Sequence, residues 1–440
     1  MSNIAVILVV LVLFTLLLLF GFYVHSVLLA AGVIGLVFLE GLPILSGLLG
    51  NAPFHSTASY TLTTIPMFVL MAQFALQSGI VQDVFYIVNR VSRGRNSFLG
   101  ALTIVVGGFL GAVSGSGTAT SASLGHVAVP ELIKHRFKPA LAGAVAASGG
   151  SLSSIIPPSI ILIVYGVATL TPVGDLFISA VIPGILVMIV YMIVMYVCLR
   201  FSRKTVEDRS SSDPRDGEEA KVPMHRLIIA SLVGIILITV IFGGIYTGVV
   251  TPTEAGAIGA LVAFIAVAVL GKLNINVLKS ALTETIKVTA MVMLIMIGAQ
   301  VFGRFISLSQ LPRQLINLLE PIMDAPTFVL LLLLLVFLIL FMFIEGAAVI
   351  LMTIPVVLPI IEAIQVDVLW FGTFIGVIGT IGLITPPVGL SVYAVSGSSK
   401  ISSDSIFQYA MVFALAATFV VGGLMIAFPE IALWLPRTME

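Results

Sequence analysis

The sequence SGGSLSSIIPP at residues 148–158 has a counterpart in GTIGLITPP at residues 379–387, and these two stretches decide the fold. Each is a run of small, hydroxyl-bearing and apolar residues that ends in two prolines. Proline lacks an N–H group and its ring clashes with the preceding turn, so a helix cannot continue through either pair. Each stretch is therefore predicted to interrupt a helix. We call residues 148–158 the first break and residues 379–387 the second break.

The two breaks belong to an internal repeat with a spacing of 229 residues. The same spacing relates other glycines and prolines: Gly117 and Gly346, Pro130 and Pro359, Gly143 and Gly372, Gly150 and Gly379. Matched backbone-breaking residues require matched backbone conformations, whereas apolar coincidences mean little in such a composition. Chance agreement is the alternative to a true repeat.

Composition places the repeat in a membrane. Of the 440 residues, 59% are hydrophobic and 9% are charged, against about 25% charged in a soluble domain. Apolar runs of 17 residues, as at 4–20 and 328–344, suit helices rather than the roughly ten-residue strands of an outer-membrane barrel. We expect an all-α polytopic membrane protein whose first span is retained, because no cleavage signal follows it. The single cysteine, Cys198, excludes an internal disulfide and a Cys-built metal site.

Apolar stretches predict ten crossings and two hairpins. The crossings are expected near 4–21, 27–45, 61–79, 139–170, 177–199, 227–247, 254–270, 288–306, 370–396 and 407–427. Residues 98–133 and 326–361 are each interrupted midway by small or polar residues, and basic residues flank the first stretch on both sides. Such a stretch is predicted to enter and leave on one face as a re-entrant hairpin, although two short full spans would also satisfy the flanks.

The basic residues set the orientation. This arrangement places 17 of the 20 Lys and Arg on the cytoplasmic side and leaves Arg304, Arg313 and Arg437 opposite, with both termini outside. Five crossings separate the hairpins, so the repeats should be inverted. We expect a scaffold from residues 1–97 and 177–306, with a cytoplasmic linker at 200–226, a transport domain from residues 98–176 and 307–400, and a last span in 401–440. The seven basic and six acidic residues of the linker nearly cancel, which gives no basis for a nucleic-acid partner.

Inverted repeats with interrupted helices indicate a secondary transporter with its site near the bilayer midplane. The prolines remove the helical donors for the carbonyls of Ser153 and Ser154 in the first break, and of Gly382 and Leu383 in the second. Opposite each break lies a hairpin tip, the first tip at residues 114–118 and the second tip at residues 345–347. Carbonyls, hydroxyls and one carboxylate would make two oxygen-lined cation sites. The predicted ligands are Ser114, Gly117, Gly149, Gly150, Ser153 and Ser154 at the first site, and Glu345, Gly346, Gly379, Thr380, Gly382 and Leu383 at the second.

The alternative is that these glycines permit close helix packing and the hydroxyls bond within their own helices. Helix N-termini facing the same cavity would also attract an anion. The candidate residues for binding a carboxylate substrate are Ser116, Thr118, Ser151, Arg304 and Thr385. Near the end of a span, Arg304 would more often extend its charge to the membrane surface, and Glu345 is expected either to bind a cation or to be protonated.

Five motifs resemble one known family. They are GSGTAT at 115–120, ASGGS leading to IPPSI at 147–160, GDLF at 174–177, YTGVVTPTEA at 246–255 and GLITPPVGL at 382–390. In this order they resemble the large membrane subunit of tripartite ATP-independent periplasmic (TRAP) transporters, over nearly the whole chain. The family commonly has Asp at the second tip where this chain has Glu345.

The resemblance implies an elevator mechanism in the bacterial inner membrane. A transport domain slides against a scaffold and carries sodium and an organic acid inward, the acid being delivered by a periplasmic binding protein. A small four-helix membrane subunit would be a separate chain, because the first span already begins at Ile4. The acid, whether a C4-dicarboxylate, a sialic acid or another carboxylate, cannot be read from the sequence.

Other functions have less support. No Gly-rich phosphate loop of an ATPase occurs, and the arrangement of Ser, His and Asp residues does not fit an intramembrane protease, so no enzyme activity is expected. A stand-alone ion-coupled anion transporter with similar hairpins, which needs neither binding protein nor small subunit, is the remaining alternative.

Overall fold

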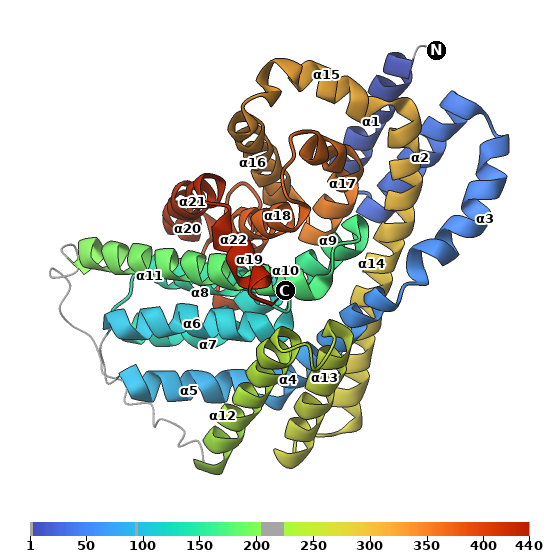
Figure 1. The fold of residues 1–440 in the computed structure, drawn as a ribbon. Helices are drawn as coiled ribbons and strands as arrows, with labels where there is room; N and C mark the ends of the chain where they lie inside the picture. The colour runs from blue at the N-terminus through green and yellow to red at the C-terminus, as the bar shows by residue number, and fades with distance from the viewer. Residues whose placement is uncertain (1–2, 93–95, 204–223, 440) are drawn as a thin grey trace.

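The structure of the protein, a computed structural model, describes residues 3–92, 96–203 and 224–439, and every regular element in these residues is helical. Figure 1 shows the arrangement. The first part of the chain forms α1 (Asn3–Leu19), α2 (Val24–Glu40), α3 (Pro43–Thr57), the 3-10 turn η1 (Tyr60–Thr63), α4 (Thr64–Ser78), α5 (Ile80–Ser92), α6 (Asn96–Ser114), α7 (Gly117–Lys134), α8 (Pro139–Ser151), η2 (Leu152–Ser154), α9 (Ile160–Thr169), α10 (Val173–Ser179) and α11 (Val181–Arg203). The second part forms α12 (Met224–Ile238), the π-helical turn η3 (Thr239–Gly244), α13 (Pro252–Val269), α14 (Ile275–Ser309), α15 (Leu311–Met323), α16 (Pro326–Phe343), α17 (Gly346–Ala363), α18 (Val368–Gly382), α19 (Leu390–Ser399), α20 (Ser403–Ala417), η4 (Thr418–Gly422), α21 (Gly423–Ala427) and α22 (Glu430–Arg437).

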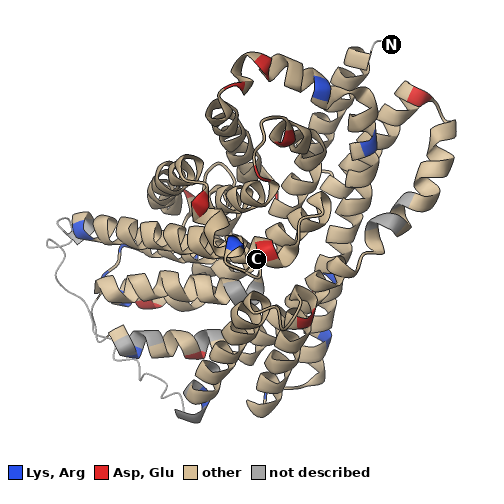
Figure 2. Cartoon of the chain, viewed as in Figure 1, with Lys and Arg blue, Asp and Glu red and all other residues tan. Residues whose placement is uncertain are grey.

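The described helices confirm a polytopic membrane protein. Seven helical segments are long and apolar enough to cross a bilayer, and several shorter helices, among them α1, α2 and α18, are also strongly apolar. Charged side chains are sparse along the helices and gather near their ends, with most Lys and Arg toward the left and bottom of the view in Figure 2.

The backbone repeats over almost the whole chain. α7 and α17 begin at Gly117 and Gly346, and α8 and α18 at Pro139 and Val368, both pairs 229 residues apart. Less regular features repeat at the same spacing: the cis peptide bonds Pro157-Pro158 and Pro386-Pro387, and the left-handed residues Arg136 and Gln365. α1 to α5 likewise correspond to α12 to α15, with α3 and α4 together matching the long α14. The repeat therefore extends far beyond the glycines and prolines from which it was predicted.

Both re-entrant hairpins and both broken helices are present. α6 and α7 turn at Gly115 and Ser116, α16 and α17 turn at Ile344 and Glu345, and each hairpin is followed by a helix pair that is interrupted at the prolines. Five crossings, α8–α9, α10–α11, α12, α13 and α14, separate the two hairpins. This odd number gives the two repeats opposite orientation, as predicted.

Close helix contacts follow the repeat symmetry. α2 packs along α14, and its counterpart α13 packs along α4. Glycines allow both approaches: a Cβ atom built on Gly32 would lie 2.7 Å from the backbone nitrogen of Phe302, and one on Gly256 would lie 3.0 Å from Cβ of Met67. The second arm of each hairpin packs on the broken helix of the other repeat: α7 packs on α19, and α17 packs on α9.

Several boundaries differ from the predictions. α14 begins at Ile275, 13 residues before the predicted span, because Asn274 caps the helix there. Many of the added residues are polar, and among them Lys287 pairs with Glu284 at 2.6 Å. An apolar-run criterion does not detect such a polar extension. It also missed α3, α5 and α15, which are too polar or too short to resemble spans. Most of the predicted cytoplasmic linker lies outside the described residues.

Candidate functional site

The first break is closed by a serine rather than left open. After η2 the chain passes through cis Pro157-Pro158 and re-enters a helix at α9, where Ser159 is the N-cap and accepts from the backbone N–H of Leu162 at 3.4 Å. The Ser159 hydroxyl donates to the carbonyl of Ser154 at 2.5 Å. The Ser154 carbonyl has lost its helical donor, as predicted, and the partner that replaces it is the Ser159 hydroxyl five residues later.

The second break satisfies its carbonyls with backbone donors. The N–H of Ser391 donates to the Leu383 carbonyl at 3.0 Å, and the N–H of Thr385 donates to the Gly382 carbonyl at 3.1 Å. The prolines remove the usual helical donors of both oxygens, as predicted, and another backbone N–H takes the place of each. A carbonyl oxygen has two lone pairs, so these atoms keep one acceptor position each.

Buried hydroxyls gather at both breaks. At the first break, Ser151 donates to the Ser148 carbonyl at 3.0 Å and Ser153 donates to the Gly150 carbonyl at 2.8 Å. At the second, Thr380 donates to Gly376 at 3.0 Å and Thr385 donates to Ile381 at 2.7 Å. A hydroxyl has one proton and two lone pairs. These four oxygens have used their proton on their own helix and can still accept from, or coordinate, a ligand.

One buried hydroxyl in the first break, and one just after the second break at the start of α19, have no hydrogen-bond partner in the described part of the chain. These are Ser148, whose carbonyl accepts from Ser151, and Ser391, whose N–H binds the Leu383 carbonyl. Both side chains are fully buried. Leaving a buried hydroxyl unpaired costs about 1–3 kcal/mol, and a bound ion or water is a usual reason for such a group. The sequence pattern of small residues gave no reason to single out either serine.

The first tip lies against both breaks. A Cβ atom on Gly117 would lie 3.3 Å from Oγ of Ser154, 3.6 Å from Oγ of Ser153 and 2.7 Å from a methyl group of Leu383. The tip itself is polar, because Ser116 caps α7 by accepting from the N–H of Ala119 at 3.4 Å and lies 3.2 Å from the Thr118 hydroxyl. These contacts bring together Ser116, Gly117, Thr118, Ser153, Ser154 and Leu383 from the predicted set. The Ser114 side chain lies outside the described part of the structure.

The second tip is capped by its acid. Glu345 is the N-cap of α17, and its carboxylate accepts from the N–H of Ala347 at 3.1 Å. Gly346 packs against Ile161 of α9, and the N–H of Gly389, which follows the second break, donates at 3.3 Å to the carbonyl of Met342 at the end of α16. The second tip is thus joined to both broken helices. No described hydrogen bond joins the Glu345 carboxylate to the second break.

Three predicted glycine ligands are packing positions. The α-carbon of Gly149 approaches α6 so closely that a Cβ on Gly107 would lie 2.7 Å from it, and a Cβ on Gly150 would lie 2.6 Å from the backbone of Ser121 in α7. A Cβ on Gly382 would likewise lie 3.1 Å from the backbone carbonyl carbon of Phe341 in α16. Close helix packing explains why these positions are glycine, and their role as carbonyl ligands stays a prediction; the hydroxyls beside them are also candidates for ligand binding.

Arg304 lies apart from the tips and breaks. It is exposed on α14 and lines a cavity of about 610 Å³ together with α3, and none of the residues that line this cavity comes from either tip or break. The structure therefore does not join Arg304 to Ser116, Thr118, Ser151 and Thr385.

A further cavity unites two of the sequence motifs. Gly174 and Asp175 of the GDLF motif and Thr251, Pro252 and Thr253 of the TPTEA motif line one cavity of about 390 Å³. Thr251 and Glu254 form a capping box at the start of α13, in which Glu254 accepts from the Thr251 N–H at 2.8 Å. The T-x-x-E spacing is a known helix-start signature, so part of this motif has a structural explanation.

Comparisons with known proteins agree with this architecture. Residues 11–431 match the family described as "Tripartite ATP-independent periplasmic transporter, DctM component". The C4-dicarboxylate TRAP transporter large permease protein DctM of Pseudomonas aeruginosa is 31% identical over 78% of this chain and 78% of its own length. The sialic acid TRAP transporter large permease protein SiaM of Vibrio cholerae is 30% identical over 86% of this chain and 87% of its own.

Two other similarities are informative. The isethionate TRAP transporter permease protein DctMQ of Oleidesulfovibrio alaskensis is 29% identical over 83% of this chain, which covers 59% of that longer protein. The solved structure of the Alcanivorax borkumensis YdaH transporter, described as having an unusual topology, has a TM-score of 0.65 at 16% identity over 92% of this chain and 90% of that one. This likeness concerns the fold alone. The relatives are permease components and not enzymes, and a tripartite system requires two components besides the large permease. The protein belongs to the DctM family, the large membrane permeases of TRAP transporters.

Proposed function

We propose that the protein imports an organic acid together with sodium, using a transport domain of residues 98–176 and 307–400 that slides against the remaining scaffold as an elevator. The observation that carries this proposal is the repeated construction of the breaks. Each break meets a hairpin tip and holds two hydroxyls with free lone pairs, and a buried hydroxyl without a partner among the described residues lies in the first break (Ser148) and four residues after the second (Ser391). Oxygen-lined breaks of this kind are where inverted-repeat transporters coordinate their coupling ions.

The geometry favours hydroxyl ligands over the carbonyls first expected. At the first break the candidate sodium ligands are Ser148, Ser151 and Ser153, and Gly117 of the first tip lies beside Ser153. At the second break they are Thr380, Thr385 and Ser391. The Glu345 carboxylate accepts from backbone N–H groups at the start of α17, among them Ala347 at 3.1 Å, and its two oxygens offer about four acceptor positions, so the acid can also bind a cation at the second tip.

The acid is proposed to bind at the first tip. Both α7 and α17 begin at a tip, and the amide groups and positive dipole end of a helix N-terminus attract a carboxylate. Glu345 already supplies a negative charge to the N-terminus of α17. The N-terminus of α7 is capped by the uncharged Ser116, which accepts from the N–H of Ala119 at 3.4 Å, so this helix end has no acidic cap to oppose a carboxylate, and Thr118 lies beside it. C4-dicarboxylate and sialic acid, named for two relatives, are the first acids to test.

The proposed assembly follows the family. A periplasmic binding protein delivers the acid, and a small four-helix membrane subunit in a separate chain extends the scaffold. The complex lies in the bacterial inner membrane with both termini of the large subunit in the periplasm. Selectivity for the acid is assigned mainly to the binding protein, because that component captures the acid before this chain does.

The test is uptake by proteoliposomes that contain the large and small subunits, with the binding protein outside. Ser153→Ala and Thr380→Val each remove one hydroxyl from one break. If one hydroxyl ligand contributes about 1–2 kcal/mol to the free energy of sodium binding, its loss should raise the sodium concentration for half-maximal uptake by about 5- to 30-fold.

Thr285→Val is the matched control. Thr285 is also buried and also donates to its own helix, to Ala281 at 2.8 Å, but it lies in α14 away from both breaks. Its sodium dependence should equal that of the unchanged protein. Uptake that proceeds equally well without a sodium gradient, or an unchanged sodium dependence in both folded break variants, would reject the sodium proposal.

A further inference from the structure

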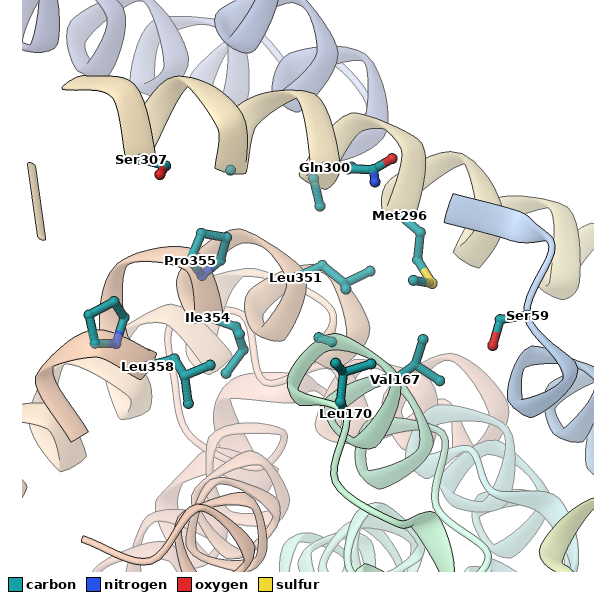
Figure 3. Close-up of a pocket in the computed structure, with 14 residues that line it drawn as sticks. Ser59, Val167, Leu170, Met296, Gln300, Ser307, Leu351, Ile354, Pro355 and Leu358 are labelled. Atoms are coloured by element: carbon teal, nitrogen blue, oxygen red, sulfur yellow. The ribbon is translucent and has the colours of Figure 1, made fainter. Parts of the chain in front are cut away.

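An elongated cavity of about 570 Å³ separates two groups of helices. One wall is α14, and the other is formed by α17 and the end of α9. In Figure 3, Ser307 lies toward one end of the cavity and Met296 and Ser59 toward the other, while Leu351 and Pro355 of α17 face α14 across it. The cavity therefore runs along α14 between the predicted scaffold and the predicted transport domain.

The walls of this cavity are unsuited to an organic acid. They consist of aliphatic side chains, prolines and Met296, and their polar members are the uncharged Gln300, Ser307 and Ser59. Burying a carboxylate against such walls would be costly. A volume of this size with apolar walls and few polar groups is typical of a site for an apolar ligand.

The length of the cavity matches one leaflet of a bilayer. Met296 and Ser307 are 11 residues apart on one helix, which at about 1.5 Å per residue is about 16 Å. The hydrocarbon core of a membrane is about 30 Å thick, so one leaflet is about 15 Å. Because α14 and α17 are both candidate membrane spans, an acyl chain along this wall would lie at the depth of its own leaflet.

A cation lies beside the cavity at the end nearer the helix terminus. Gln300, Gly303 and Ser307 line this cavity and also the 610 Å³ cavity toward α3, which contains Arg304. The two cavities thus share one face of α14. Arg304 lies about one turn before the end of α14 and forms no ion pair with a carboxylate in the described part of the chain. A phosphate group at the membrane surface would be a suitable partner for it.

From this arrangement we infer a phospholipid site, with the phosphate on Arg304 and one acyl chain in the 570 Å³ cavity between α14 and α17. The ligand class is an anionic phospholipid of the outer leaflet. A lipid held there fills the gap between the two groups of helices, so it has to leave or to rearrange when they slide. That consequence rests on the proposed elevator motion, whereas the binding itself does not.

The test measures lipid retained by the purified, delipidated protein after incubation with phosphatidylglycerol, using native mass spectrometry. Leu358→Trp adds bulk to the cavity wall, and Leu358→Ala is its control because it enlarges the same wall. Arg304→Gln removes the cation, and Arg313→Gln is its control because Arg313 is exposed on α15 and lines neither cavity. We expect Arg304→Gln to lower retention about five-fold and Leu358→Trp to lower it at least as much, whereas Leu358→Ala should lower it less than Leu358→Trp and Arg313→Gln should retain lipid like the unchanged protein.

Two results would overturn the inference. The first is equal retention of phosphatidylglycerol in the Leu358→Trp and Arg304→Gln variants and their controls, with thermal unfolding confirming that all four are folded. The second is displacement of the lipid from the unchanged protein by millimolar organic acid, together with loss of acid binding in Arg304→Gln. That outcome would show that the cation serves the substrate, and it can be read independently of sodium-driven uptake.

Discussion

Gly150 and Gly379 occupy the same place in the two repeats, yet their surroundings differ. A Cβ on Gly150 would lie 2.6 Å from the backbone of Ser121, which cannot move aside without separating α7 from α8. A Cβ on Gly379 would lie 3.2 Å from a methyl group of Ile161 and 3.3 Å from the ring of Phe341, and both side-chain ends can shift slightly. One glycine is required by close backbone packing, and the other is not.

Gly150→Ala should therefore lower the free energy of unfolding by about 1–3 kcal/mol, the usual cost of overpacking. Gly379→Ala should change it little, because alanine gains about 1 kcal/mol of helix propensity that offsets the tighter contact. Thermal unfolding of the two purified variants in detergent, beside the unchanged protein, measures the difference. Equal destabilisation by both substitutions would mean that the packing of α8 and α18 is more alike than the structure indicates.

At the breaks, the sequence identified the right positions but only part of the chemistry. Paired prolines require an interruption whatever surrounds them, so both breaks and both tips could be predicted. The hydrogen bonds could not, because they depend on how the chain returns after the prolines: Ser159 reaches back to Ser154, and Ser391 reaches back to Leu383. Whether Ser148 finds a partner is likewise decided by neighbouring helices and not by its own segment.

Two short amphipathic helices connect the predicted scaffold to the hairpins. α5 precedes the first hairpin and α15 precedes the second, and each begins directly after a left-handed residue, Gly79 or Gln310. They differ in attachment. Asp83 of α5 is buried and pairs with Arg226 of α12 at 3.0 Å, whereas no residue of α15 is buried.

Lys272, in the turn between α13 and α14, lies near the same ion pair. Partial burial lowers the pKa of Lys272, the Arg226 charge lowers it further, and the Asp83 charge raises it. Asp83 thus supplies a negative charge to both cations, Arg226 and Lys272. Removing it leaves like charges without a counter-charge, while removing Arg226 leaves Asp83 with Lys272.

Asp83→Asn should accordingly lower the free energy of unfolding by about 1.5–3 kcal/mol, the range for hydrogen bonds to charged groups, and Arg226→Gln should lower it by less. Thermal unfolding at low ionic strength gives both values. Lys287→Gln is the control, because its pair with Glu284 is exposed and such pairs contribute about 0–1 kcal/mol. If Asp83→Asn behaves like Lys287→Gln, α5 is not attached to α12 by this pair.

Helices with a long continuous apolar run could be predicted from the sequence, whereas helices without one could not. Crossings such as α1, α2, α4 and α13 were located within a few residues, because a membrane demands a continuous apolar run. α5 and α15 were missed because a helix that lies at the edge of a domain needs an apolar stripe and not an apolar run.

For the whole molecule, inversion of the repeats makes a prediction about sidedness. Lys134 ends the first hairpin and Asp324 precedes the second, and both are exposed. In a background in which the single cysteine is removed by Cys198→Ser, a cysteine at position 134 should react with a membrane-impermeant maleimide only from the cytoplasmic side. A cysteine at position 324 should react only from the periplasmic side. Permeabilised cells, in which both positions must react, are the control, and labelling of both from the same side would contradict the odd number of crossings.

Sliding of the transport domain makes a separate prediction, about which helix contacts must change during transport. Gly303 of α14 and Pro355 of α17 are close enough that a Cβ on Gly303 would lie 3.4 Å from Cβ of Pro355, near the 3.5–4.5 Å that a disulfide spans. Cysteines at these two positions, again in the Cys198→Ser background, should form a disulfide on mild oxidation. Uptake should then stop and should return on reduction, because the bond joins the predicted scaffold to the predicted transport domain.

The matched pair lies within the predicted scaffold. A Cβ on Gly256 of α13 would lie 3.0 Å from Cβ of Met67 in α4, so Gly256→Cys with Met67→Cys should cross-link as readily. An elevator moves the transport domain past a scaffold whose own contacts stay fixed, so this second disulfide should leave uptake unchanged. Full uptake with a complete disulfide between positions 303 and 355 would mean that α14 and α17 keep their contact throughout the cycle. In that case the acid would have to cross the membrane by local opening of the tips, with no sliding of the domain that carries them.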